Sequence, residues 1–266
     1  MDDLKRQLAP IPDSAWAELE DNAKQTLKVA LAGRRVVDFE GPLGWQTASI
    51  SVGRVNDLGT VREGVNAAVR VVQPLIELTA PFELQRAEVD AISRGARDAD
   101  LDPMLDAASR IARAEDNLIF NGYSDAGIRG ICDTARSPVL PLTPDYQQYP
   151  GVVAEALSEL RKAGVSGPYA IALGPKCYTG LTKTTQGGYP VLQHVTKLLD
   201  GPVVWAPEVD GAVVLSLRGG DFSLTVGRDL SIGYLAHTAS SVTLYFQETL
   251  TFRVLGPEAA IILKYS

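Results

Sequence analysis

A long alternation of residue types near the end of the chain, from Val242 to Val254, sets the strictest limit on the fold. The even positions read Val, Leu, Phe, Glu, Leu, Phe, Val, and the odd positions read Thr, Tyr, Gln, Thr, Thr, Arg. A period of two predicts a β-strand with one buried face. Glu248 is the polar residue on that face. Because a buried charge needs a partner, an ion pair within the chain or at an interface is favoured over a catalytic base.

Two segments have the three- and four-residue spacing of apolar side chains that predicts an amphipathic helix. The first is Pro12–Leu31, with Pro12 at the first helical position. Its apolar stripe is narrow and rich in alanine, so we expect this helix to contact another element or a partner. The second is Asp100–Asn121, the longest helix, which Asp102 can cap and in which Pro103 occupies the first helical position.

Residues 45–76 show weak alternation that is interrupted by Gly53, Gly59 and Gly64. This pattern predicts short strands separated by turns, in a two-stranded arm. An isolated hairpin has little apolar surface of its own to bury and is marginal in water. We therefore expect the arm to need a neighbour, either another domain or another subunit.

The second half of the chain predicts a small α/β unit. A helix over residues 152–163, a strand over 169–173, a helix from Pro175 and a strand over 203–205 follow one another. The composition changes near Ser137, where we expect a domain boundary.

A hairpin is predicted after this unit. The alternating segments 212–217 and 222–226 are joined by Arg218-Gly-Gly-Asp221, and a Gly-Gly pair suits a tight turn that requires positive φ. We therefore expect these two segments to pair with each other.

Charge and rare residues exclude several functional classes. With 25 Lys+Arg against 32 Asp+Glu, the net charge is -7, which argues against nucleic acid as the main partner. The sequence has neither an apolar run of 18 residues nor a typical secretion signal, so we expect no membrane partner and a cytoplasmic location. Cys132 and Cys177 are far apart, as are His194 and His237, so neither a disulfide framework nor a metal site is predicted. Common catalytic motifs are missing too, which favours a protein that is not an enzyme.

Some charged residues allow two interpretations. Glu115 and Asp116 are adjacent on the predicted long helix and do not share a face, so pairing with Arg110, Arg113 or a residue from another strand is favoured over a catalytic carboxylate pair. The doublet Arg34-Arg35 with Asp38 could hold a partner peptide by charge, or could form a salt bridge within the chain. These two readings stay open.

The loop Gln186–Pro190 is either a plain surface turn or a functional loop, because glycines beside a tyrosine are common where a surface is presented. His194 and His237 are interpreted as surface or capping residues, and a ligand role is disfavoured for both.

Several short strings together resemble one family over essentially the whole chain. Each is weak alone, but they occur in order and at the family's spacing. The set resembles the encapsulins of the linocin or bacteriocin-like group. The main strings are Ala32–Asp38, Glu40–Trp45, Glu115–Phe120, Gly188–Pro190, Arg218–Asp221, Gly227–Tyr234 and Gln247–Phe252.

The resemblance implies an α+β fold like that of tailed-phage major capsid proteins, with a P-domain, an E-loop and an A-domain. The expected boundaries are 1–44 for the first helix and the start of the P-domain, 45–76 for the E-loop, 77–136 for the P-domain with its spine helix, 137–221 for the A-domain, and 222–266 for the C-terminal strands of the P- and A-domains.

The resemblance also implies a function. Encapsulins assemble, typically as sixty subunits, into hollow icosahedral shells that package enzymes bearing a C-terminal targeting peptide, including peroxidases and ferritin-like iron oxidases. The positions that match the family's peptide groove are Leu27, Leu31, Arg34, Val37, Asp38, Asp229, Leu230, Ile232 and Tyr234. The positions that match the loop lining the fivefold pore are Gln186, Gly187, Gly188 and Tyr189.

The chain departs from some relatives at Ala87. Those relatives bind a flavin through a tryptophan in this segment, and because Ala87 has no ring on which a flavin could stack, we expect no cofactor. The alternative function is a prophage major capsid protein that packages DNA, which the acidic composition disfavours. A secreted bacteriocin or protease is a third reading, against which the lack of a signal segment and of a nucleophile argues.

Overall fold

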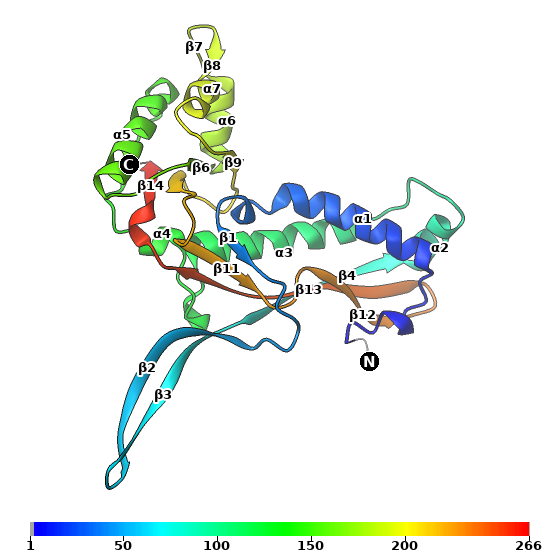
Figure 1. Ribbon diagram of the computed structural model, residues 1–266. Helices are drawn as coiled ribbons and strands as arrows, with labels where there is room; N and C mark the ends of the chain where they lie inside the picture. The colour runs from blue at the N-terminus through cyan, green and yellow to red at the C-terminus, as the bar shows by residue number, and fades with distance from the viewer. Residues whose placement is uncertain (1–2, 266) are drawn as a thin grey trace.

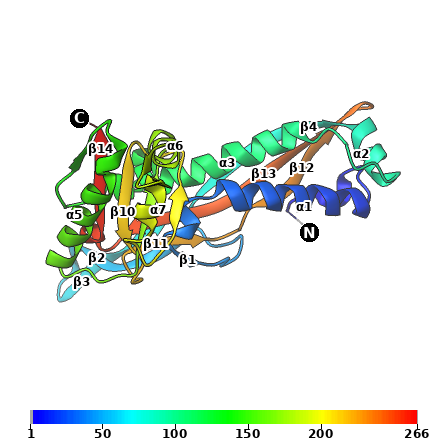
Figure 2. The ribbon, with the colours of Figure 1, turned by 90° about the horizontal axis from the view of Figure 1, so that it is seen from above.

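The computed structural model describes residues 3–265 and places two long helices side by side over one face of a sheet (Figures 1 and 2). These helices are α1 (Asp13–Ala30) and α3 (Asp102–Asn121), and the short α2 (Arg86–Ser93) lies at their far end. Both long helices predicted from the sequence are confirmed. In detail, Pro12 is the residue before α1 rather than its first residue. Asp102 begins α3 without capping it, so Pro103 is the second residue of the helix rather than the first.

The sheet beneath these helices is organised around its longest strand, β13 (Ser241–Val254). The strand β4 (Ile76–Gln85) pairs with one edge of β13, and β11 (Phe222–Val226) and β12 (Ser231–His237) pair with the other edge, all antiparallel. The short β1 (Asp38–Glu40) pairs parallel with β11. The alternation in β13 turns Leu244, Phe246 and their even-numbered neighbours toward the helices, which confirms the predicted strand. The single buried face is wrong, because most of the odd-numbered residues, from Tyr245 to Thr251, are buried as well.

A second five-stranded sheet stands at the other end of the molecule, in the order β5-β14-β10-β6-β9. Its helices are α5 (Tyr149–Lys162), α6 (Pro175–Lys183) and α7 (Val191–Thr196), and α4 (Ile131–Thr134) precedes it. The predicted order of helix, strand, helix and strand is confirmed. Its strands are β5 (Leu140–Leu142), β6 (Tyr169–Leu173), β9 (Val203–Trp205), β10 (Ala212–Ser216) and β14 (Ala260–Tyr265).

The predicted hairpin between β10 and β11 is wrong, because these strands belong to different sheets. Both edges of β10 are occupied, one by β6 and the other by β14, which arrives from the end of the chain. The segment Arg218–Asp221 is therefore a link between the sheets. Its two glycines do have positive φ, and Arg218 forms an ion pair with Asp221.

The strands β2 (Ser49–Arg62) and β3 (Val65–Pro74) form a hairpin that projects away from both sheets (Figure 1). The predicted two-stranded arm is therefore confirmed as a structure. Its ladder is irregular, with three shifts in register. Large apolar side chains are exposed along it, namely Val55, Leu58, Val61, Val65, Val69 and Val72.

Candidate functional site

A groove lies between α1, the start of β12 and the segment that holds Leu4 and Arg6. Its volume is about 580 Å³. The apolar residues that line it are Leu4, Ala23, Leu27, Leu31, Leu230, Ile232 and Phe246, and the polar ones are Arg6, Glu20, Lys24, Lys28, Arg34, Asp229 and Ser231. The groove therefore has an apolar floor and a charged rim.

The groove is lined by residues from the end of α1 and from the start of β12. Leu27 lies in the last turn of α1 and Leu31 directly follows the helix, where its backbone N–H donates to the carbonyl of Leu27. On β12, Ile232 is buried and faces the same core as Phe246 of β13. The narrow apolar stripe of α1 thus covers the sheet with part of its width and leaves the rest to line the groove.

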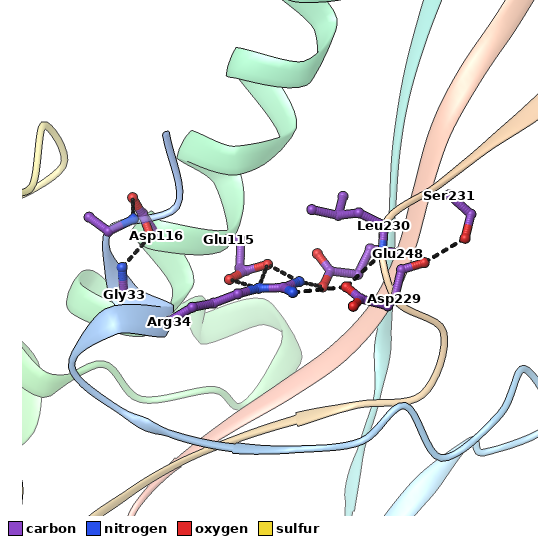
Figure 3. A network of polar contacts seen from close by, with 9 residues as sticks. Gly33, Arg34, Glu115, Asp116, Asp229, Leu230, Ser231 and Glu248 are labelled. Atoms are coloured by element: carbon purple, nitrogen blue, oxygen red, sulfur yellow. Dashed lines mark hydrogen bonds and ion pairs between the residues drawn. The ribbon is translucent and has the colours of Figure 1, made fainter. Parts of the chain in front are cut away.

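Arg34 and Asp229, which line the groove, belong to a cluster of charged side chains from four separate segments of the chain (Figure 3). Arg34, in the 3-10 turn Gly33–Arg35, donates from Nε and Nη2 to the carboxylate of Glu115 on α3, at 2.8–3.0 Å. It also donates from Nη1 to Asp229 at 2.9 Å and from Nη2 to Glu248 of β13. Glu115 and Glu248 are fully buried. The expected ion pair of Glu248 is confirmed, and it lies within the chain.

Arg34 faces more carboxylates than it can neutralise. Burial raises the pKa of Glu248 well above its usual range, the charge of Glu115 raises it further, and Arg34 opposes this. In addition, Oε2 of Glu248 has no hydrogen-bond partner within the described part of the chain. The pKa of Glu248 therefore lies above its usual range, and Glu115 accepts most of the hydrogen bonds that Arg34 donates in the cluster.

Asp116, the neighbour of Glu115, makes different contacts. Its two carboxylate oxygens accept hydrogen bonds from the backbone N–H groups of Ala32 and Gly33, at 3.0 and 2.7 Å. Burial raises the pKa of Asp116 to about 7, although these two hydrogen bonds oppose the shift. A side chain at Gly33 would meet Ile119 at 2.5 Å, so glycine permits the close approach. Asp116 therefore fixes the turn that carries Arg34.

The partners predicted for Glu115 need correction. Arg110 donates to the backbone carbonyl of Pro81, and the partner of Glu115 is Arg34, which lies 81 positions away in the chain. Of the two readings of the Arg34-Arg35 doublet, the intrachain salt bridge holds for Arg34, which also lines the groove. Asp38 is not its partner, because Asp38 accepts a hydrogen bond from Gly220 N.

Most residues predicted for the peptide groove do lie together. Six of the nine line it: Leu27, Leu31, Arg34, Asp229, Leu230 and Ile232. Val37 and Asp38 line a separate hollow of about 210 Å³ beside β11. Tyr234 is buried farther along β12, where its hydroxyl is 2.6 Å from Nδ1 of His237. Sequence reasoning missed Leu4 and Arg6, because the first residues show no periodicity that would bring them here.

Comparison with known proteins identifies the family. A family model described as "Encapsulating protein for peroxidase" matches residues 1–251. A type 1 encapsulin shell protein of Rhodospirillum rubrum is 55% identical over 99% of this chain and 97% of its own length. A type 1 encapsulin shell protein of Mycobacterium tuberculosis is 46% identical over the full length of both chains. The chain belongs to the encapsulin family.

Solved structures show that this encapsulin has the capsid fold expected from the resemblance. A virus-like particle protein of Pyrococcus furiosus covers 94% of the chain and 99% of its own, with a TM-score of 0.67 at 18% identity. The capsid protein of the myovirus XM1 covers 88% of this chain and 90% of its own, with a TM-score of 0.56 at 10% identity. At such identities the likeness shows the α+β capsid fold alone. The full-length relatives do not favour the prophage alternative.

The loop expected at the pore of this encapsulin is a small exposed hairpin at the tip of the α/β unit (Figure 1). Its strands are β7 (Thr185–Gln186) and β8 (Tyr189–Pro190). Gly187 and Gly188, which join them, have φ of 60° and 84°, a region that favours glycine. The hairpin is supported from below by His194, whose Nε2 lies 3.1 Å from the carbonyl oxygen of Gln186.

Three further features concern residues 3–265 of this encapsulin. No group of three or more His, Cys, Asp or Glu side chains there is arranged to hold a metal ion. Both cysteines are free thiols. None of the helices in this part of the chain is both long and apolar enough to span a membrane.

The charged cluster predicts a dependence of stability on pH. Because folding raises the pKa of Glu248, the contribution of this residue to the free energy of unfolding is fully present below its unfolded pKa, about 4.5. The contribution is lost as the pH rises toward the folded pKa. Glu248→Gln mimics the protonated form, so we expect it to reduce the fall in melting temperature between pH 5 and 9. Thermal unfolding across this pH range is the measurement.

Glu83→Gln is the matched control, because Glu83 is exposed on the neighbouring strand β4. It removes the same charge without touching the cluster and should leave the pH profile unchanged. Asp116 contributes to the pH dependence of stability with the same sign, between about pH 4 and pH 7, and both variants retain this contribution. If Glu248→Gln is instead less stable than the wild type at pH 8, the raised pKa of Glu248 is wrong.

Proposed function

We propose that this encapsulin forms a closed icosahedral shell of sixty subunits in the cytoplasm, and that the shell packages a peroxidase or a ferritin-like iron oxidase. The cargo enzyme would carry a C-terminal targeting peptide that binds in the groove. The shell subunit itself supplies no catalytic step. Two surfaces support the proposal: the projecting arm for assembly and the groove for cargo.

The arm supports assembly because it exposes six large apolar residues on a hairpin that contacts little else in its own chain. Exposed apolar surface of this kind marks an interaction site. We propose that the arm is the E-loop and that a second copy of the chain covers it. We also propose the domain boundaries that the resemblance implies. The E-loop spans 45–76, the P-domain with its spine helix spans 77–136, and the A-domain spans 137–221, with 1–44 and 222–266 as the flanking segments.

The groove is the observation that carries the cargo proposal. A peptide needs a concave, mainly apolar site with a few polar groups at its edge. The groove has this character, and Leu27, Leu31, Leu230 and Ile232 form much of its floor. The description of the family model, a protein that encapsulates peroxidase, supports the choice of cargo class. The net charge of -7 gives no support to DNA as the packaged molecule.

We propose that the β7–β8 hairpin lines a pore on the fivefold axis, with Gln186, Gly187, Gly188 and Tyr189 at the aperture. All four residues are exposed, and nothing lies within 4 Å of a Cβ added at either glycine. Five copies could thus approach closely around the axis, leaving an opening for small polar solutes and metal ions.

Cargo loading tests the role of the groove. The chain is co-expressed with a green fluorescent protein that carries the C-terminal tail of a peroxidase from the same host, and reporter fluorescence per particle is measured. We expect Leu230→Glu to lower loading at least about tenfold, because it buries a charge on the apolar floor. Leu235→Glu is the control, since Leu235 lies on β12, which Leu230 directly precedes, is 54% exposed and does not line the groove. Equal loading in both variants would place the peptide elsewhere.

A further inference from the structure

The first described residues of the chain run along the open edge of β12. This strand is the last in its sheet and pairs with β13 along one edge only. At its other edge, Tyr234 N donates to the carbonyl of Leu4 at 2.9 Å, and Arg6 Nε donates to the carbonyl of Ile232 at 2.7 Å. The segment Asp3–Leu8, here called the strap, thus occupies backbone groups that an edge strand would otherwise offer to a partner.

Arg6 joins the strap to both sides of the groove. Besides its bond to Ile232 on β12, it forms an ion pair with Glu20 on α1 and lies over the ring of Trp16, 4.7 Å from the ring centroid. An ion pair between Asp3 and Arg228 fixes the start of the strap. Between these points, Lys5 has a φ of 54°, the one positive value at a non-glycine residue in the described chain. Contacts on both sides hold this uncommon conformation in place.

The strap is held by polar contacts rather than by burial. No residue of its 3-10 turn, Arg6–Leu8, is buried, and Leu8 is 66% exposed. Leu4 and Arg6 nevertheless line the groove, as Leu27 does. The strap is therefore a wall of the groove that contributes little to the core of the subunit.

We propose that the strap is the third wall of the peptide groove and that Arg6 is the residue that positions it. The proposal rests on the groove being the site of the targeting peptide. Because the strap already uses Tyr234 N and Ile232 O, the peptide cannot extend the sheet by adding a strand at these groups. It is instead held by its apolar side chains between α1, the floor and the strap.

Two measurements test the proposal, with Arg6→Ala as the variant and Gln7→Ala as the control, because Gln7 is an exposed neighbour. In empty particles, hydrogen exchange at the amide of Tyr234 should be at least about tenfold faster in Arg6→Ala than in the wild type. In the co-expression assay with the tailed green fluorescent protein, loading should fall about fivefold in Arg6→Ala, since a lost wall weakens retention of the peptide. Gln7→Ala should match the wild type in both.

The outcomes separate this proposal from the cargo function. If Leu230→Glu lowers loading and Arg6→Ala does not, the strap is not part of the peptide site. Unchanged exchange at Tyr234 would show that Arg6 does not hold the strap and would also overturn the proposal. If neither Leu230→Glu nor Arg6→Ala changes loading, the groove itself is not the cargo site, and the failure belongs to the proposed function. Electron micrographs of each variant verify that the particles are intact.

Discussion

Deletion of residues 50–70 is expected to abolish closed shells while leaving the α/β unit folded. The deletion removes most of β2 and β3, including five of the six exposed apolar residues of the arm. It removes nothing from the five strands of the α/β unit, which begins at Leu140. Because the arm contributes almost nothing to the cores within one subunit, its loss should act on assembly alone.

The size of the effect follows from the contacts available to the arm. An isolated two-stranded hairpin is marginally stable in water, so the extended arm needs a neighbouring chain to cover it. Each exposed valine or leucine that becomes buried contributes roughly 1.5–3 kcal/mol, and a shell repeats the contact at every subunit. Size-exclusion chromatography and electron microscopy measure the loss of particles, and circular dichroism measures the retained fold.

A pair of point variants on the same strand refines the test. Leu58→Asp places a charge at an exposed apolar position of β2, and Asn56→Asp places the same charge at an exposed polar position two residues earlier. We expect the first to impair assembly and the second to have little effect. Normal particles from the chain lacking 50–70 would falsify the assignment of the arm to assembly.

Arg34→Ala is expected to be the most destabilising single substitution in the charged cluster. It leaves Glu115 and Glu248 fully buried with no cation within the cluster. Breaking a buried ion pair by removing one partner typically costs about 3–5 kcal/mol. For a chain of this size, each kcal/mol lowers the melting temperature by about 2–4 °C.

The loss should depend on pH, because protonation can relieve the unpaired carboxylates. We therefore expect Arg34→Ala to be more strongly destabilised at pH 8 than at pH 5. Arg34→Lys should not restore stability, since a lysine cannot donate to Glu115, Asp229 and Glu248 in the forked geometry of a guanidinium.

Arg35→Ala provides the matched control. Arg35 is the next residue, is exposed, and forms no ion pair among residues 3–265. Its loss should change the melting temperature by little, as is usual for surface substitutions. Equal melting temperatures for the Arg34→Ala and Arg35→Ala variants would contradict the structural role assigned to the cluster.

Local patterns predicted most of the elements because each depends on neighbouring residues. The alternation through β13 predicted the strand and marked Glu248 as a residue in need of a partner, and the ion pair with Arg34 meets that need. The glycine-interrupted segment predicted an arm with little to bury, and β2–β3 is such an arm. The spacing on α1 also indicated a thin stripe, part of which lines the groove.

Long-range pairing could not be predicted in the same way. The segments 212–217 and 222–226 have the pattern of a hairpin. In the folded chain, however, β14 and β6 pair with the two edges of β10, so no edge is left for β11. Likewise, nothing near Glu115 indicates Arg34 as its partner, because the contact depends on the packing of the 3-10 turn against α3. The strap residues Leu4 and Arg6 lie in a segment too short to show periodicity, so only the folded chain brings them to the groove.

The mass and shape of the purified particle decide whether the chain is the subunit of a closed shell. Sixty copies of a 28.5 kDa chain amount to about 1.7 MDa. Native mass measurement with electron microscopy of the recombinant protein should give hollow, uniform spheres of about this mass. A stable monomer or dimer at micromolar concentration would contradict the assignment.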